Sequence, residues 1–147
     1  MSLPGAILVN GGHVDLSTRF ASNNNTVVAS PSGASETVVG RLLAIPSNIQ
    51  VTAGVVVAAC LAYTVGTNGV SVRYRIRQGI TAGSGTVIYD SGVTTAGISA
   101  ANLVQDSFFG VDTAASFPGQ QYCVTLTVGS GSATSTVTTA NLIALII

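Results

Sequence analysis

Alternation of apolar and polar residues with a period of two is the feature that most constrains the fold of this chain. In the segment 70–77 the even positions are Val, Val, Tyr and Ile, whereas the odd positions are Ser and three Arg. In the segment 121–128 the even positions are Tyr, Val, Leu and Val, and the odd positions are Gln, Cys and two Thr. This pattern places one face of a strand in a core and the other in water. Both segments are therefore predicted to be β-strands.

Six further segments have strand character, and clusters of turn residues separate them. They cover residues 37–45, 49–51, 54–65, 86–89, 103–111 and 133–147. The segment 66–69 ends in Asn68-Gly69, a pair typical of tight turns, which predicts a hairpin between its flanking strands. At most one short helical turn is expected, over residues 96–104. About eight short strands with regular turn signals predict an all-β fold, an antiparallel β-sandwich that is jelly-roll-like.

The first 35 residues lack this alternation and are predicted to form an extended N-terminal arm. They hold Pro4, Pro31, several glycines and the run Asn23-Asn24-Asn25. Ordering such a segment costs roughly 1 to 2 kcal/mol of backbone entropy per residue, so we expect it to lie against its own sandwich or a neighbour. The chain is therefore divided into an arm, residues 1–35, and a β-sandwich domain, residues 36–147. The arm residues expected to bind a partner are Leu3, Ile7, Leu8, Val9 and Phe20.

Three predicted strands carry apolar residues on both faces, which a lone antiparallel sandwich does not require. They are 37–45, 54–65 and the last of the chain, where residues 142–147 are Leu-Ile-Ala-Leu-Ile-Ile. Burying one Leu or Ile side chain is worth roughly 1.5 to 3 kcal/mol, so several left in water would favour association. We expect a homo-oligomer; the alternative is a monomer in which the arm or the loops cover these faces. The expected interface residues in this segment are Leu142, Ile143, Leu145, Ile146 and Ile147.

The low charge of the chain excludes several classes of partner. Charged residues make up 7% of it, against roughly 25% in an ordinary domain. Five arginines balance five acids and there is no lysine, so neither nucleic acid nor an anionic membrane surface is an expected partner. The missing lysine also excludes a P-loop and Schiff-base catalysis. The start of the sequence lacks the pattern of a signal peptide, and segment 51–65 is shorter than the ~20 residues of a membrane helix.

Arg73, Arg75 and Arg77 form a row on one face of the strand 70–77, because alternate residues of a strand share a face. One interpretation is a solvated outer face. The other is an interface in which the row pairs with acids of a neighbouring molecule, such as Glu36, Asp106 or Asp112. We favour the interface, since arginine suits bidentate pairing with carboxylates at contacts.

The sequence offers little chemistry for catalysis or for metal binding. The single histidine, His13, could share a face with Asp15, which gives at most two of the ligands that zinc needs. No Gly-x-Ser-x-Gly motif and no calcium-loop spacing occur. We therefore expect no enzyme, no metal, no cofactor and no small-molecule substrate. Cys60 and Cys123 are expected to be free thiols within strands, with a disulfide between them left open.

The chain resembles the small structural proteins of tailed bacteriophages and similar viruses, above all capsid decoration (cement) proteins. The resemblance rests on the Gly-, Asn- and Ser-rich arm, on strands such as Val-Ser-Val-Arg-Tyr-Arg-Ile-Arg at 70–77, and on the low-charge Ala, Val, Thr and Gly composition. It implies a protein that is made in the host cytoplasm and then sits on the capsid surface. There it would clamp subunits of the major capsid protein, often as a trimer, and reinforce the shell.

A second function stays open at this point: a receptor- or glycan-binding β-sandwich of a phage fibre, tail or collar. The absence of Trp and the 5% of aromatic residues argue against the glycan version, because sugars stack on exposed rings. Exposure of one of the four tyrosines, which all fall on apolar faces of the predicted strands, would favour it.

Overall fold

The computed structural model describes residues 6–9, 12–15, 20–23, 25–26, 31–42, 53–94, 100–113, 119–129 and 134–147, with side chains from residue 31 onward. These residues form strands and no helix. In chain order the strands are β1 (Ala6–Val9), β2 (Gly12–Asp15), β3 (Phe20–Asn23), β4 (Asn25–Thr26), β5 (Thr37–Leu42), β6 (Val55–Val65), β7 (Val72–Gln78), β8 (Val87–Asp90), β9 (Val104–Asp112), β10 (Tyr122–Val128) and β11 (Ser135–Ile146).

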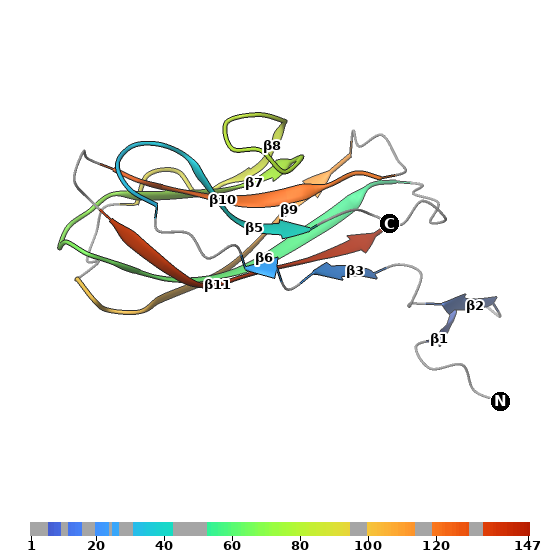
Figure 1. The fold of residues 1–147 in the computed structure, drawn as a ribbon. Helices are drawn as coiled ribbons and strands as arrows, with labels where there is room; N and C mark the ends of the chain where they lie inside the picture. The colour runs from blue at the N-terminus through green and yellow to red at the C-terminus, as the bar shows by residue number, and fades with distance from the viewer. Residues whose placement is uncertain are drawn as a thin grey trace.

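Two sheets pack face to face (Figure 1). One has five strands in the order β4-β5-β10-β7-β8, and the other has four in the order β3-β11-β6-β9. All of these pairings are antiparallel. The β1–β2 hairpin forms a small sheet of its own, which Figure 1 shows apart from the sandwich.

The order in which strands pair identifies the fold as a jelly roll. The pairings are nested: β7 pairs with β8, β6 with β9, β5 with β10, and β3 with β11. A long hairpin that is rolled up so that its successive pairs alternate between two sheets produces this order. The predicted all-β, jelly-roll-like sandwich is therefore confirmed, and eight strands form the nested set.

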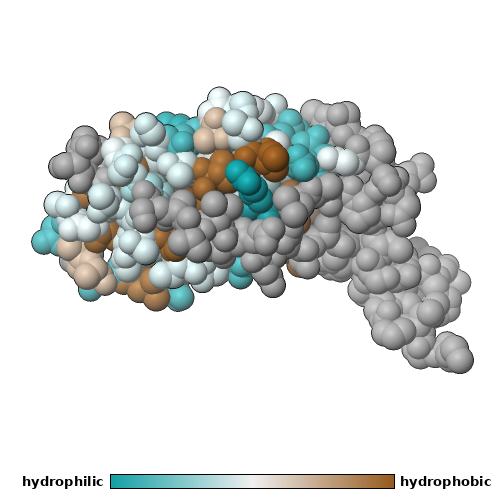
Figure 2. Space-filling view, viewed as in Figure 1, coloured by the Kyte–Doolittle hydropathy of each residue, from teal (hydrophilic) through white to brown (hydrophobic). Residues whose placement is uncertain are grey.

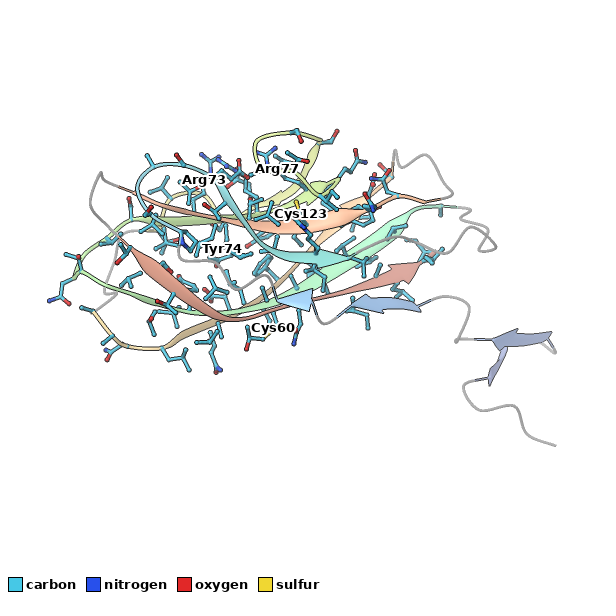
Figure 3. The ribbon with its side chains drawn as sticks, viewed as in Figure 1. Cys60, Arg73, Tyr74, Arg77 and Cys123 are labelled. Carbon is cyan, nitrogen blue, oxygen red and sulfur yellow. The ribbon has the colours of Figure 1, made fainter. Side chains whose placement is uncertain are left out.

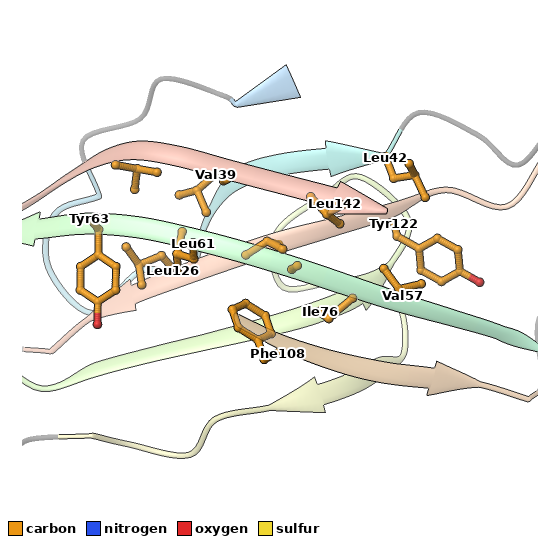
Figure 4. Close-up of a cluster of buried hydrophobic side chains, with 14 of the residues drawn as sticks. Val39, Leu42, Val57, Leu61, Tyr63, Ile76, Phe108, Tyr122, Leu126 and Leu142 are labelled. Carbon is orange, nitrogen blue, oxygen red and sulfur yellow. The ribbon is translucent and has the colours of Figure 1, made fainter. Parts of the chain in front are cut away.

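The core lies between the two sheets and follows the alternation seen in the sequence (Figure 4). On β7, Val72 and Ile76 are buried. On β10, the even-numbered residues from Tyr122 to Val128 are buried in the core, and Cys123 and Thr125 on the opposite face, which was predicted to lie in water, are buried as well. Each sheet thus contributes one apolar face, which is the arrangement that period-two alternation predicts.

Glycines allow the two sheets to approach each other closely toward both sides of the sandwich, between the edge strands β8 and β9 and between β5 and β11. On one side, a Cβ at Gly110 of β9 would lie 2.6 Å from the carbonyl oxygen of Ile88 in β8. On the other side, a Cβ at Gly40 of β5 would lie 2.8 Å from the carbonyl oxygen of Ala140 in β11. Real Cβ atoms do not approach a carbonyl so closely, so both contacts depend on the absence of a side chain.

The hairpin predicted around Asn68-Gly69 is wrong. Gly69 does adopt a positive φ of 67°, so the turn itself forms, but β6 and β7 belong to different sheets. The turn carries the chain from one layer to the other. Strand β6 pairs with β9 and β11, and strand β7 pairs with β8 and β10, so no pairing joins β6 to β7. Strands β6 and β7 therefore lie in different sheets, and their apolar residues meet in the core between the sheets.

The bounds of the other predicted strands agree with the structure to within a few residues, or the predicted elements lie outside the described residues. Strand β9 begins at Val104 and strand β11 at Ser135. Strand β5 ends at Leu42, and the predicted strand at 49–51 lies outside the described residues. Residues 96–99 of the helical turn expected at 96–104 also lie outside the described residues; of the rest, residues 100 and 101 form a turn and Val104 begins β9.

The N-terminal 35 residues contribute to both sheets. Strand β3 pairs with β11 and strand β4 pairs with β5. Phe20 lies opposite Leu145 in the β3–β11 register. The segment that the sequence predicts to be an arm therefore supplies an edge strand to each layer, in addition to the separate β1–β2 hairpin.

Candidate functional site

The outer face of the five-stranded sheet carries the arginine row, Arg73, Arg75 and Arg77 of β7. Two carboxylates lie between the three guanidinium groups. Asp90 accepts hydrogen bonds from Arg73 Nε at 2.8 Å, from Arg73 Nη2, and from Arg75 Nε at 2.9 Å. Glu36 accepts from Arg77 Nε at 2.6 Å and Nη2 at 2.9 Å, and its Oε2 lies 3.2 Å from Arg75 Nη1. The result is one continuous chain of ion pairs with a single positive charge in excess.

Within the chain, the arginine row pairs with Asp90 and Glu36, whereas the sequence predicted acids of a neighbouring molecule; an interface at this row stays a prediction. The strand order explains the pairing within the chain. Strand β8 lies next to β7 and places Asp90 opposite Arg75. Glu36 stands immediately before β5 and reaches across β10, where it also accepts a hydrogen bond from Thr125. The three arginines are therefore held by acids of their own chain.

The ion-pair network shifts the acid–base properties of both carboxyl groups. Burial alone would raise the pKa of Glu36, but the hydrogen bonds from Arg77 and Thr125 outweigh it, and the pKa is lowered from 4.5. The hydrogen bond from Arg73 holds the pKa of Asp90 far below its usual value of 3.8, despite the opposing effect of burial. Both groups are therefore ionised at neutral pH, and the network is intact under ordinary conditions.

The outer face of the four-stranded sheet has the opposite character. The outward residues of β11, β6 and β9 form three cross-strand rows: Leu145–Val56–Val111, Ile143–Ala58–Phe109 and Asn141–Cys60–Ser107. None of the outward residues of these three strands is charged, and most are apolar. Phe109 is 62% exposed, and Val111 and Ile143 are also exposed. This face is therefore an apolar surface that no described part of the chain covers.

A hollow of about 450 Å³ lies in this apolar surface. Small side chains of the central strand, Ala58 and Cys60, form its floor, and the larger Phe109 and Ile143 stand on either side. Asn141 and Ser107 close one end with uncharged polar groups. The hollow can receive an apolar side chain of another molecule, with two hydrogen-bonding groups at its edge.

The predicted interface residues of β11 divide between the two sides of the sheet. Ile143 and Leu145 point outward, whereas Leu142 and Ile146 are buried in the core of the chain itself. Alternation along the strand explains this division. Ile147 follows the strand, is 38% exposed, and exchanges backbone hydrogen bonds with Gly54 at 2.9 and 3.0 Å.

The predicted partner-binding residues of the arm are not brought together. Ile7, Leu8 and Val9 lie on β1 of the separate hairpin, and Phe20 begins β3 in the four-stranded sheet. Leu3 lies outside the described residues. Of the described residues in this set, Phe20 is the one whose strand borders the apolar surface, through the pairing of β3 with β11.

Sequence reasoning missed Phe109, the most exposed large hydrophobic residue of the apolar surface. The sequence signal is present but weak: Ser107, Phe109 and Val111 alternate with Phe108 and Asp112, so both faces of the strand carry an aromatic ring. Phe108 packs inward against Tyr74 and Tyr89 at centroid distances of 4.7 and 4.9 Å.

The two cysteines lie on opposite sheets (Figure 3). Cys60 is exposed in the floor of the hollow, whereas Cys123 is buried on β10, and both are free. Burial raises the pKa of the Cys123 thiol to about 11, so this thiol stays protonated and unreactive at neutral pH. The disulfide that the sequence left open does not form within the chain.

None of the four tyrosines is exposed, so the feature that would favour a glycan-binding site is missing. Tyr63 and Tyr122 are buried in the core. Tyr74 and Tyr89 are partly buried and stack with each other and with Phe108 at the edge where β8 meets β9. In the view of Figure 2 the described surface is mainly white or pale, with apolar brown areas between small patches of teal.

Among the described residues, no three His, Cys, Asp or Glu side chains lie close enough together to hold a metal ion. Within the same part of the chain, no helix is long and apolar enough to cross a membrane.

No protein-family model matches the chain, and no curated protein matches its sequence. Among solved structures, it is similar to a chain in the structure of infectious bursal disease virus, Gt strain, with 14% identity over 98% of this chain and a TM-score of 0.54. It is similar to the VP2 subviral particle of the same virus, with 11% identity over 98% of the chain and a TM-score of 0.54. Eiger TNF from S. frugiperda matches over 88% of this chain and 93% of its own, with 9% identity and a TM-score of 0.48. The chain spans 38% of each of those two viral chains. At these identities the likeness shows the fold: an antiparallel β-sandwich like that found in a viral capsid protein.

Proposed function

We propose that this chain is a structural protein of a virion, which stabilises a capsid shell by packing against copies of itself and against other virion proteins. The single observation that carries the proposal is the uncharged apolar outer face of the four-stranded sheet, on a jelly roll that resembles a viral capsid protein. Exposed apolar patches of this kind mark sites of protein association.

The finer assignment is that of a decoration (cement) protein. In this role the chain forms a homo-oligomer, with a trimer as the expected form, and binds the major capsid protein at the virion surface. Its action is passive: it buries surface, and it needs neither a cofactor nor a bound substrate. The low charge of the whole chain supports such a role, because few charges must lose their water when the subunits meet.

Co-sedimentation with particles tests the virion assignment. Particles are prepared from the source of the sequence, separated on a density gradient, and probed with an antibody raised against the purified chain. A virion protein bands with intact particles in a fixed ratio to the major shell protein. Recovery of the chain only from slowly sedimenting fractions contradicts the assignment.

The decoration role has a separate test. A decoration protein binds to the outside of a shell that assembles without it, so the purified chain should bind particles that lack it and raise the temperature at which they release their nucleic acid. If particles cannot assemble without the chain, it is instead a component of the shell itself.

A further inference from the structure

The apolar surface of the four-stranded sheet combines a protruding side chain with a hollow. Phe109 projects from β9, and the hollow lies beside it over Ala58 and Cys60 of β6. The two features differ because the central strand carries small outward residues while β9 and β11 carry larger ones. The hollow therefore has one aromatic wall, Phe109, and lies over the central strand β6.

We propose that this surface is the contact between copies of this chain, in which Phe109 of one copy enters the hollow over Ala58 and Cys60 of another. The inference rests on the proposed function and identifies the surface that would join its subunits. Each copy carries both the protruding ring and the hollow, so one type of contact can serve every subunit of a closed oligomer.

Charge is the first argument for a second copy as the occupant. A surface that meets a copy of itself must avoid like charges, since their juxtaposition costs several kcal/mol. The outward residues of β6, β9 and β11 include no charged residue. The outer face of the five-stranded sheet, by contrast, holds the arginine row with its excess positive charge, and would repel its own copy.

Area is the second argument. Strand β6 has 11 residues, which at a rise of ~3.3 Å make a length of about 36 Å. Three strands at a spacing of ~4.8 Å make a width of about 14 Å, and so a flat area of about 500 Å² before the relief of the side chains is counted. That value is of the same order as the ~800 Å² that each partner buries in an interface of standard size.

The test compares the solution mass of three variants with that of the unaltered chain, by light scattering over a range of concentrations. Phe109→Asp places a charge on the protruding position, and Ala58→Phe fills the hollow from within the same chain. Val93→Asp is the matched control, because Val93 is 65% exposed and lines a hollow beside the arginine row instead. Circular dichroism and thermal unfolding show whether each variant is folded.

We expect the unaltered chain and Val93→Asp to be oligomers of the same mass. Phe109→Asp and Ala58→Phe should both raise the dissociation constant by at least about 10- to 100-fold, since the contact loses a buried aromatic side chain. Because one variant adds charge and the other adds only volume, failure of either to fold leaves the other as a test.

Reactivity of Cys60 gives a second measurement on the same surface. Its thiol lies in the hollow, so a maleimide should label it slowly in the oligomer and rapidly in Phe109→Asp. A Cys60→Ser variant of each protein gives the background. The rate in Val93→Asp should match that of the unaltered chain.

Two results would overturn the inference. If folded Phe109→Asp and Ala58→Phe keep the mass of the unaltered chain and the slow labelling of Cys60, the copies associate through another surface, and the proposed function survives. If the unaltered chain is a monomer with rapidly labelled Cys60 at every concentration, no contact between copies exists. Co-sedimentation with particles then decides separately whether the chain is a virion protein.

Discussion

Glu36 joins two arginines of β7 to the start of β5, and replacing it with glutamine should measurably weaken the fold. The carboxylate accepts hydrogen bonds from Arg77 Nε at 2.6 Å and Nη2 at 2.9 Å, and lies 3.2 Å from Arg75 Nη1. The side chains of Glu36, Arg75 and Arg77 are only 12–14% exposed. Water therefore screens these pairs less than it screens pairs on an open surface.

The size of the effect follows from the position of the pairs between surface and core. An exposed ion pair is worth about 0–1 kcal/mol, whereas breaking a fully buried one costs about 3–5 kcal/mol. Glutamine keeps the length of the side chain and one acceptor oxygen. We therefore expect Glu36→Gln to lower the free energy of unfolding by about 2 kcal/mol at pH 7, and Tm by about 4–8 °C.

The pH dependence distinguishes a charge effect from a packing effect. The pKa of Glu36 is lowered in the folded protein from 4.5 in the unfolded chain. Its contribution to stability is therefore complete above about pH 4.5 and is lost as the pH falls through the lower, folded value. The difference between the unaltered chain and Glu36→Gln should accordingly shrink on acidification.

Urea unfolding at fixed protein concentration, from pH 7 down to the acid limit of the native state, measures this difference. Asp90→Asn serves as the comparison and should cost about 1–2 kcal/mol, because Asp90 pairs with both Arg73 and Arg75 but is more exposed to solvent than the Glu36 group. A loss below about 0.5 kcal/mol at pH 7 for Glu36→Gln, or a loss that stays constant as the pH falls, would refute the reasoning.

Three further changes probe other parts of the fold. Gly110→Ala should destabilise the protein by about 1–3 kcal/mol in urea unfolding, because the new Cβ would meet the carbonyl oxygen of Ile88 at 2.6 Å. Unchanged stability would mean that β8 and β9 do not approach each other so closely there. Tyr122→Phe removes the 2.8 Å hydrogen bond from the buried hydroxyl to Asp112 Oδ2 and should cost about 1–2 kcal/mol, whereas a neutral result would show that the group is satisfied otherwise. Cys123 should resist maleimide at neutral pH until the protein is unfolded in guanidinium, and labelling in the native state at the rate of the unfolded chain would contradict its burial.

Local pattern predicted much of the fold because alternation along one strand reports which face is buried. Strands β7 and β10 and the inward position of Val72, Ile76 and Leu126 all follow from the sequence without knowledge of the partners. The pattern could not choose partners for a strand. The Asn68-Gly69 turn predicted a hairpin, yet it connects two sheets, because pairing is decided by the burial of all the strands together.

The outer faces of the two sheets show the same division between what the sequence determines and what only the tertiary structure decides. The sequence by itself determined that the arginine row shares one face, that the 54–65 strand has a second apolar face with Ala58 and Cys60, and that residues 142–147 are apolar on both sides. Only the tertiary structure decided that Asp90 and Glu36 of the same chain hold the arginines, and that Phe109 and Ile143 flank the hollow. The physical reason is that the side of a strand on which a residue points is a local property, whereas the residue that it meets depends on strands brought together from distant parts of the chain.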